Sequence, residues 1–78
     1  MTDPLKEEVL AALQRMGVTP LLGGLVPEPA VADLLGYAQS YLRRLAAAGQ
    51  APIPFVRRGN RRFYKVDDIC LFVTKTVG

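Results

Sequence analysis

The sequence contains no histidine and only one cysteine, Cys70. The chain therefore lacks the commonest general base and the commonest metal ligand. A single cysteine forms neither an intramolecular disulfide nor a cysteine-based zinc site. Because these absences exclude a disulfide-stapled secreted scaffold, a reducing cytoplasm is the simplest compartment. We expect no enzyme, no catalytic residue, no metal site, no cofactor and no small-molecule ligand.

Long apolar runs are also missing. The longest is far shorter than the roughly 20 residues that a membrane span needs. The first residues lack the basic start and the apolar stretch of a signal peptide, so we expect no membrane partner. The 78 residues suffice for one small domain, which buries only about 60% of the surface of its unfolded chain and has little room for a deep substrate cleft.

The charges are segregated along the chain. The formal net charge is +3, but residues 1–42 carry two basic and five acidic side chains, a net −3, whereas residues 43–78 carry eight basic and two acidic ones, a net +6. Most of these basic residues are arginines, whose planar guanidinium groups pair with phosphates and with guanine edges. This asymmetry favours a polyanionic partner, although a merely solvated surface would have the same composition.

Residues 1–24 are predicted to form an N-terminal helix and a connector. Asp3 and Pro4 are typical of a helix start and Gly17 of a helix end. One apolar face is predicted from residues at helical spacing, which are Leu5, Val9, Ala12, Leu13 and Met16. This face should cover the core of its own chain or pair with the same helix of a second subunit.

The connector continues to residue 29. Residues 17–29 contain three prolines and three glycines. No helix or central strand tolerates that density, so we expect an extended segment that packs on the surface of the domain through its leucines.

Residues 25–78 are predicted to hold two short helices, a hairpin and a last helix. The two helices span 29–36 and 38–48 and are joined around Gly36, as in a helix-turn-helix. Two strands then flank Gly59-Asn60, a pair that suits a two-residue turn with positive φ. Asp67 or Asp68 should cap the final helix.

Two arginines lie on each side of the predicted turn: Arg57, Arg58, Arg61 and Arg62. Like charges that face each other destabilise a hairpin, so their presence predicts an anion near the tip. Since side chains alternate between the faces of a strand, we expect two of these arginines to face DNA and two to face solvent.

In this order and spacing, the elements resemble the winged helix-turn-helix of excisionase-type and MerR-like DNA-binding domains. The resemblance covers residues 25–73 without a gap and is carried by the runs 32–36, 40–45, 49–52, 56–64 and 66–73. It departs from the family at Ala38, where a serine is common, and at Arg43, where an aromatic residue is common. It implies a mainly α fold with a β-hairpin, a winged helix-turn-helix to which the chain adds an N-terminal helix.

The resemblance also implies how DNA would be bound. The helix over 38–48 would enter the major groove, and the hairpin, as the wing, would lie along a phosphate backbone or in the minor groove. The candidate DNA contacts are Gln39, Ser40, Tyr41, Arg43 and Arg44 on the helix, with Arg57, Arg58, Asn60, Arg61 and Arg62 on the hairpin. Gln39 and Arg43 share one face of the helix, so we expect them to read base edges while the hairpin arginines hold phosphates.

Other side chains have simpler roles. Phe55, Phe63 and Tyr64 are able to stack on bases, but we expect at least two of them in the core. Cys70 is expected to be buried, and Tyr41 is suited equally to a phosphate contact or to packing.

The sequence therefore predicts a sequence-specific double-stranded DNA-binding protein, a small prokaryotic or phage transcriptional regulator. Because one such domain reads few base pairs, we expect a homodimer or cooperative neighbours on DNA. Two alternatives stay open. One is an excisionase-like architectural factor that bends DNA for site-specific recombination, and the other is a protein–protein adaptor that uses residues 4–16 and the connector.

Overall fold

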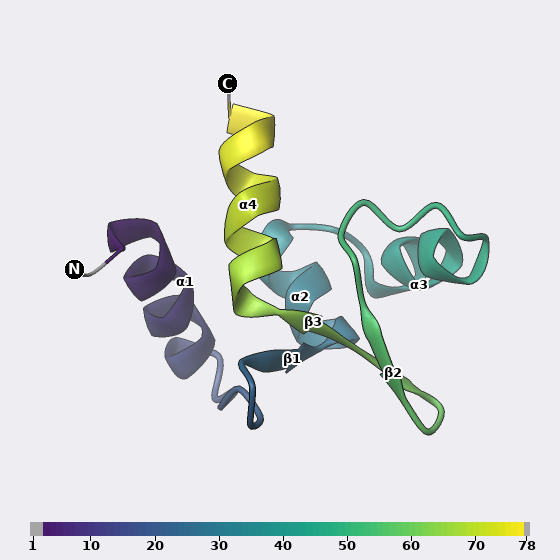
Figure 1. Ribbon diagram of the computed structural model, residues 1–78, viewed down its shortest axis with the longest axis horizontal. Coiled ribbons are helices and arrows are strands. Elements are labelled where there is room, and N and C mark those ends of the chain that lie inside the picture. Colours follow the sequence, from purple (N-terminus) through teal and green to yellow (C-terminus); the bar gives the residue numbers. More distant parts are fainter. Residues whose placement is uncertain (1–2, 78) are drawn as a thin grey trace.

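In the computed structural model, residues 3–77 are described, and they form four α-helices and one three-stranded antiparallel sheet. The elements follow in the order α1 (Pro4–Arg15), β1 (Leu25–Pro27), α2 (Glu28–Leu35), α3 (Gln39–Ala47), β2 (Val56–Arg58), β3 (Arg61–Lys65) and α4 (Val66–Val77). Figure 1 shows α1 and α4 on one side of the molecule and α3 with the β2–β3 hairpin on the other. Within this described part, no helix is long and apolar enough to cross a membrane.

The sheet contains a strand that the sequence did not predict. Its order is β1-β3-β2, with Val26 opposite Tyr64 in one ladder and Val56 opposite Phe63 in the other. The predicted helices and hairpin are present, and the added strand β1 makes the structure a small α+β domain rather than a mainly α fold with a hairpin alone. Pro27, which has no N–H, is tolerated because it ends a three-residue strand at the edge of the sheet. The prediction that no central strand forms in this segment is confirmed.

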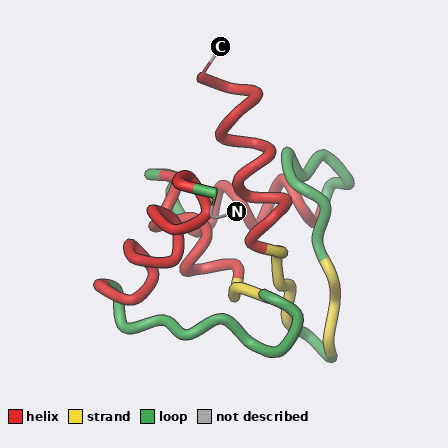
Figure 2. Tube along the Cα trace, turned by 60° about the vertical axis from the view of Figure 1, so that its left-hand side comes forward, coloured by secondary structure: helices red, strands yellow, loops and turns green. Residues whose placement is uncertain are grey.

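The connector before β1 is a surface loop. In Figure 2 it runs along the edge of the molecule opposite the C-terminus. Gly23 and Gly24 have φ values of +91° and +74°, which only glycine adopts without strain, and they turn the chain into β1. Leu22, just before them, is 97% exposed, so the connector packs through only part of its apolar residues.

Helix α1 begins and ends near the predicted residues. The Asp3 carboxylate accepts a hydrogen bond of 3.0 Å from the Leu5 N–H, which satisfies one of the free donors of the first turn. Val9 and Leu13 are buried, but Met16 is 39% exposed. The prediction that Met16 belongs to the apolar face is wrong: Met16 is the C-cap residue of α1, and the chain turns away at Gly17.

All four helices and two of the three strands contribute to the core. Val9 and Leu13 of α1 belong to the same buried cluster as residues of β1, α2, α3, β3 and α4, among them Val26, Val31, Leu42, Tyr64 and Ile69. Helix α1 packs on α4 and α2, and the Lys6 Nζ lies 3.1 Å from the Asp67 Oδ1 at the start of α4. The expectation that α1 covers the core of its own chain is confirmed.

Strand β3 continues into α4 without a loop, since Lys65 is the last residue of the strand and Val66 the first of the helix. The Val66 N–H donates a 2.9 Å hydrogen bond to the Gly24 carbonyl, which fixes the junction against the start of β1. Cys70 on α4 is buried as expected. Burial raises the pKa of its thiol, and the Asp3 and Asp67 carboxylates add to the effect.

We predict that Leu13→Ala lowers the free energy of unfolding by about 2–5 kcal/mol, because it removes a fully buried side chain and leaves a cavity between α1 and the rest of the core. Leu10→Ala is the matched control on the same helix, where the side chain is partly exposed, and it should cost less than about 1 kcal/mol. Urea unfolding of the two variants measures the difference. Equal small losses would show that α1 is not part of the core.

Candidate nucleic-acid interface

Helices α2 and α3 are joined by a tight turn. Gly36 has the left-handed φ of +81° that ends α2, and the following Tyr37 N–H donates to the Ala32 carbonyl at 2.8 Å. Helix α3 starts directly after Ala38, which provides no side-chain cap. Instead the Gln39 side chain at its first position donates to the Asp33 carboxylate on α2, at 3.3 Å to each oxygen. This contact ties the exposed start of α3 to the helix before it.

One side of α3 is free for a ligand. Leu42 and Ala46 are buried and hold the helix against α2, while Leu45 is half-buried. The candidate contact residues on α3 are all exposed, and they are Gln39, Ser40, Tyr41, Arg43 and Arg44. Tyr41 also packs edge-on against Tyr37, with ring centroids 5.8 Å apart, so its ring has a packing role.

The hairpin has the predicted two-residue turn. Gly59 has a φ of +63° and Asn60 does not have a positive φ, which is the sign pattern of a type II′ turn. The register places Arg57 opposite Arg62 and Arg58 opposite Arg61. Two arginine pairs therefore face each other across the strands, as the sequence indicated, and each pair shares one face of the hairpin.

Three of the four hairpin arginines are exposed and make no ion pair with the described residues, whereas the fourth pairs with Glu28. Arg57, Arg58 and Arg61 are exposed, and the two ion pairs among the described residues do not involve them. The Arg62 side chain is only 19% exposed, with its Nη1 3.7 Å from the Glu28 Oε1. Its guanidinium carbon lies 5.7 Å from the centre of the Phe55 ring. Strand alternation alone did not predict that Arg62 would be covered in this way.

Glu28 lies beside the candidate residues, although the sequence did not predict a role for it. It is buried at the start of α2, and its Oε2 accepts a hydrogen bond of 2.9 Å from the Tyr64 hydroxyl on β3. Burial of the ring, and then this hydrogen bond, raise the pKa of Tyr64 well above its usual value. A lone acid within the otherwise apolar run of residues 25–32 was the available signal, because a buried charge requires partners.

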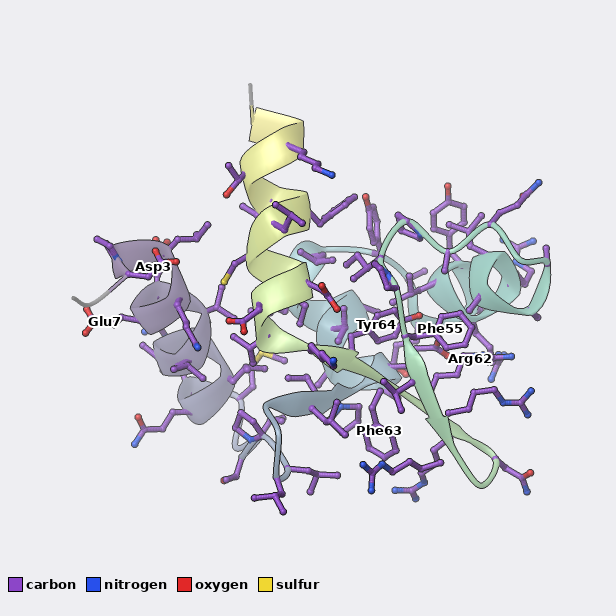
Figure 3. The ribbon with its side chains drawn as sticks, viewed as in Figure 1. Asp3, Glu7, Phe55, Arg62, Phe63 and Tyr64 are labelled. Atoms are coloured by element: carbon purple, nitrogen blue, oxygen red, sulfur yellow. The ribbon has the colours of Figure 1, made fainter. Side chains whose placement is uncertain are left out.

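The aromatic residues divide between the two faces of the hairpin. Figure 3 shows Phe55, Arg62 and Tyr64 on the side toward α3 and Phe63 on the opposite side. Phe63 and Tyr64 are buried, which confirms that at least two of the three aromatic residues pack in the core. Phe55 is half-buried, and its ring lies 6.0 Å from that of Tyr64.

A cleft of about 320 Å³ opens between the start of α2, the helix α3 and the hairpin turn. It is lined by Pro27, Glu28, Pro29, Arg43, Asn60, Arg61 and Arg62. The cleft brings Arg43 of α3 together with the turn of the hairpin, which lies far away in the sequence. The other candidate contact residues, Gln39, Ser40, Tyr41, Arg44, Arg57 and Arg58, do not line it.

Comparison of the chain with protein-family models, with curated proteins and with solved structures gave no match. The described residues also hold no group of three or more histidine, cysteine, aspartate or glutamate side chains that could bind a metal ion.

We predict that Glu28→Ala lowers the free energy of unfolding by about 2–4 kcal/mol, because it leaves the Tyr64 hydroxyl without its acceptor and the Arg62 guanidinium without its counter-charge. Asp33→Ala removes an exposed carboxylate from the same helix and should cost less than about 1 kcal/mol. The double variant Glu28→Ala/Arg62→Met should recover part of the loss, since no unpaired charge remains. Urea unfolding at neutral pH measures all three, and a Glu28 variant as stable as the Asp33 variant would contradict the assignment.

Proposed function

We propose that this chain is a sequence-specific double-stranded DNA-binding protein, a small transcriptional regulator that uses a winged helix-turn-helix. The observation that carries the proposal is the convergence of arginines from α3 and from the β2–β3 hairpin on one cleft. These two elements correspond to the helix and the wing of the family that the sequence resembles. Both lie on the same side of the molecule, away from α1 (Figure 1).

Helix α3 is the element proposed to enter the major groove. An α-helix has a diameter of about 10–12 Å and the major groove is about 12 Å wide, so a helix fits with its polar side against the base edges. Leu42 and Ala46 anchor α3 in the core, which leaves Gln39, Ser40 and Arg44 outside. Because the Gln39 Nε2 is held by Asp33, its amide is oriented before DNA arrives, and its Oε1 remains available.

The hairpin is the element proposed to hold the backbone. Arg57, Arg58 and Arg61 are exposed and outside the ion pairs of the described residues. Their mutual repulsion across the strands is relieved when phosphates lie between or beside them. Together with Arg43 and Arg44 they make five exposed arginines on the two elements.

A single copy presents one short helix, and this limits the number of base pairs that it reads. We therefore propose that useful affinity requires a homodimer or neighbouring copies on the DNA. An architectural factor would instead bend its site, and measuring the bend angle of the bound duplex separates this alternative from a regulator.

The chain is predicted to bind a random pool of DNA duplexes at low salt, with log affinity falling linearly against log salt concentration. Five phosphate contacts give a slope of about −4 to −5. Arg58→Ala should flatten the slope by about one unit. Arg15→Ala and Lys75→Ala remove the same charge from α1 and from α4 and should leave the slope unchanged. No binding at low salt, or binding that salt does not weaken, would refute the DNA proposal and favour an apolar adaptor.

Gln39→Ala is predicted to act differently from the hairpin variants. Loss of a base-edge contact should weaken binding to the preferred site, obtained by selection from a random pool, by about 1–3 kcal/mol and relax the preference at particular positions. Gln50→Ala, which removes an exposed glutamine beyond the end of α3, is the control and should change neither quantity. The affinity of each variant for the preferred and for a random duplex is compared with that of Arg58→Ala, which should weaken both by similar factors. If only Arg58→Ala loses the preference for the selected site, the hairpin reads the bases and α3 holds the backbone, which is the reverse of the proposal.

A further inference from the structure

We infer that the cleft between α3 and the hairpin turn binds one phosphate group of the DNA backbone, gripped jointly by Arg43 and Arg61. The inference rests on the proposed function and names the ligand of one part of the interface. It also assigns Arg43 to a backbone phosphate, in place of the base-edge contact that its position beside Gln39 on α3 predicts. Three features of the cleft support it: its charge, the source of its hydrogen-bond donors and its place in the fold.

The charge in the cleft is unbalanced. Three guanidinium groups line it, from Arg43, Arg61 and Arg62, and the one carboxylate is that of Glu28. Glu28 is already engaged, because its Oε2 accepts from Tyr64 and its Oε1 lies beside Arg62. Arg43 and Arg61 line the cleft and take part in neither ion pair of the described residues, and the four charged lining residues carry a formal charge of +2. An anionic group is the ligand that this charge attracts.

Several lining residues of the cleft carry side-chain hydrogen-bond donors. Pro27 and Pro29 form part of its wall and have no N–H group to offer. The Asn60 amide lies on the wall as well, at the turn of the hairpin. The Arg62 Nε is buried without a hydrogen-bond partner, and its Nη1 lies 3.7 Å from Glu28, so Arg43 and Arg61 are the exposed arginines of the cleft. Guanidinium forks of this kind match the oxygens of a phosphate.

The size and place of the cleft favour a backbone phosphate. Its volume of about 320 Å³ exceeds a single water site, about 30 Å³, and lies at the lower end of the range for small-molecule pockets. It lies between the exposed side of α3 and the hairpin turn. In the proposed binding mode α3 enters the major groove and the hairpin lies along the backbone, so the cleft between them would lie beside the phosphates of a strand that borders the groove.

Two arginines that share one phosphate are energetically coupled, whereas arginines on separate phosphates act independently. This difference gives the test. The cleft pair is Arg43→Ala, Arg61→Ala and the double variant. The matched pair is Arg44→Ala, Arg57→Ala and their double variant, which removes the same charges from the same two elements outside the cleft. All four side chains are exposed, and thermal unfolding verifies that each variant is folded.

Dissociation constants are measured on one duplex at one salt concentration. Each single variant should weaken binding about tenfold. The Arg43/Arg61 double variant should bind only about twentyfold more weakly than the wild type, far less than the hundredfold expected from two independent losses. The Arg44/Arg57 double variant should bind about a hundredfold more weakly. Multiplicative losses for both pairs, with wild-type binding intact, would overturn the inference and leave the proposed function standing. A wild-type chain that does not bind the duplex would overturn the proposed function itself.

Neutral methylphosphonate links placed one at a time along the duplex locate the phosphate. At one position the neutral link should weaken binding of the wild-type chain. The same link should not weaken binding of Arg43→Ala or Arg61→Ala any further. It should still weaken binding of Arg44→Ala and Arg57→Ala. Titration with inorganic phosphate against chloride at matched ionic strength, followed through the arginine Nε–H signals in NMR spectra, shows whether the cleft also takes free phosphate. Shifts at Arg43 and Arg61 with free phosphate, but no shared position in the duplex, would identify a small-anion site and overturn the assignment to DNA.

Discussion

The structure depends on one buried carboxylate. Glu28 lies at the first position of α2, where water is largely excluded, and a charge in such a place must be paired. Its two partners, Tyr64 and Arg62, both belong to β3, the central strand. Because β3 pairs with both β1 and β2, the contacts that Glu28 makes with Tyr64 and Arg62 position the sheet against α2. The position of the hairpin relative to α3 follows from the same contact, since α2 and α3 pack together.

This arrangement divides the arginines of the hairpin into two kinds. The Arg62 side chain is largely covered, and it pairs with Glu28 and lies over the Phe55 ring. Arg57, Arg58 and Arg61 remain outside, where nothing in the described chain neutralises them. A hairpin with four equivalent arginines would repel itself on both faces. The pair of Arg62 with Glu28 reduces that repulsion on one face of the hairpin. The remaining positive charge is concentrated at the turn and beside α3.

Local signals in the sequence predicted most of the helices and the turn, but not the contacts between distant residues. The start of α1 is encoded by Asp3 and Pro4, and the hairpin turn by Gly59-Asn60, all of which act on neighbouring backbone. Strand β1 exists only because β3 lies beside it, and its three residues carry no strand pattern of their own. Glu28 and Tyr64 are 36 residues apart, and Arg43 and Arg61 line the same cleft only because of how α3 sits against the hairpin. Strand alternation assigned the hairpin arginines to two faces, but it does not say which face the rest of the chain covers.

The direct passage from β3 into α4 leaves the two elements without a spacer. No loop residue separates Lys65 from Val66, and the Val66 N–H donates to the Gly24 carbonyl at this junction. Helix α4 is about 18 Å long and projects from the body of the molecule (Figure 2). The strand that carries two of the hairpin arginines is therefore joined directly to the C-terminal helix, with no loop between them.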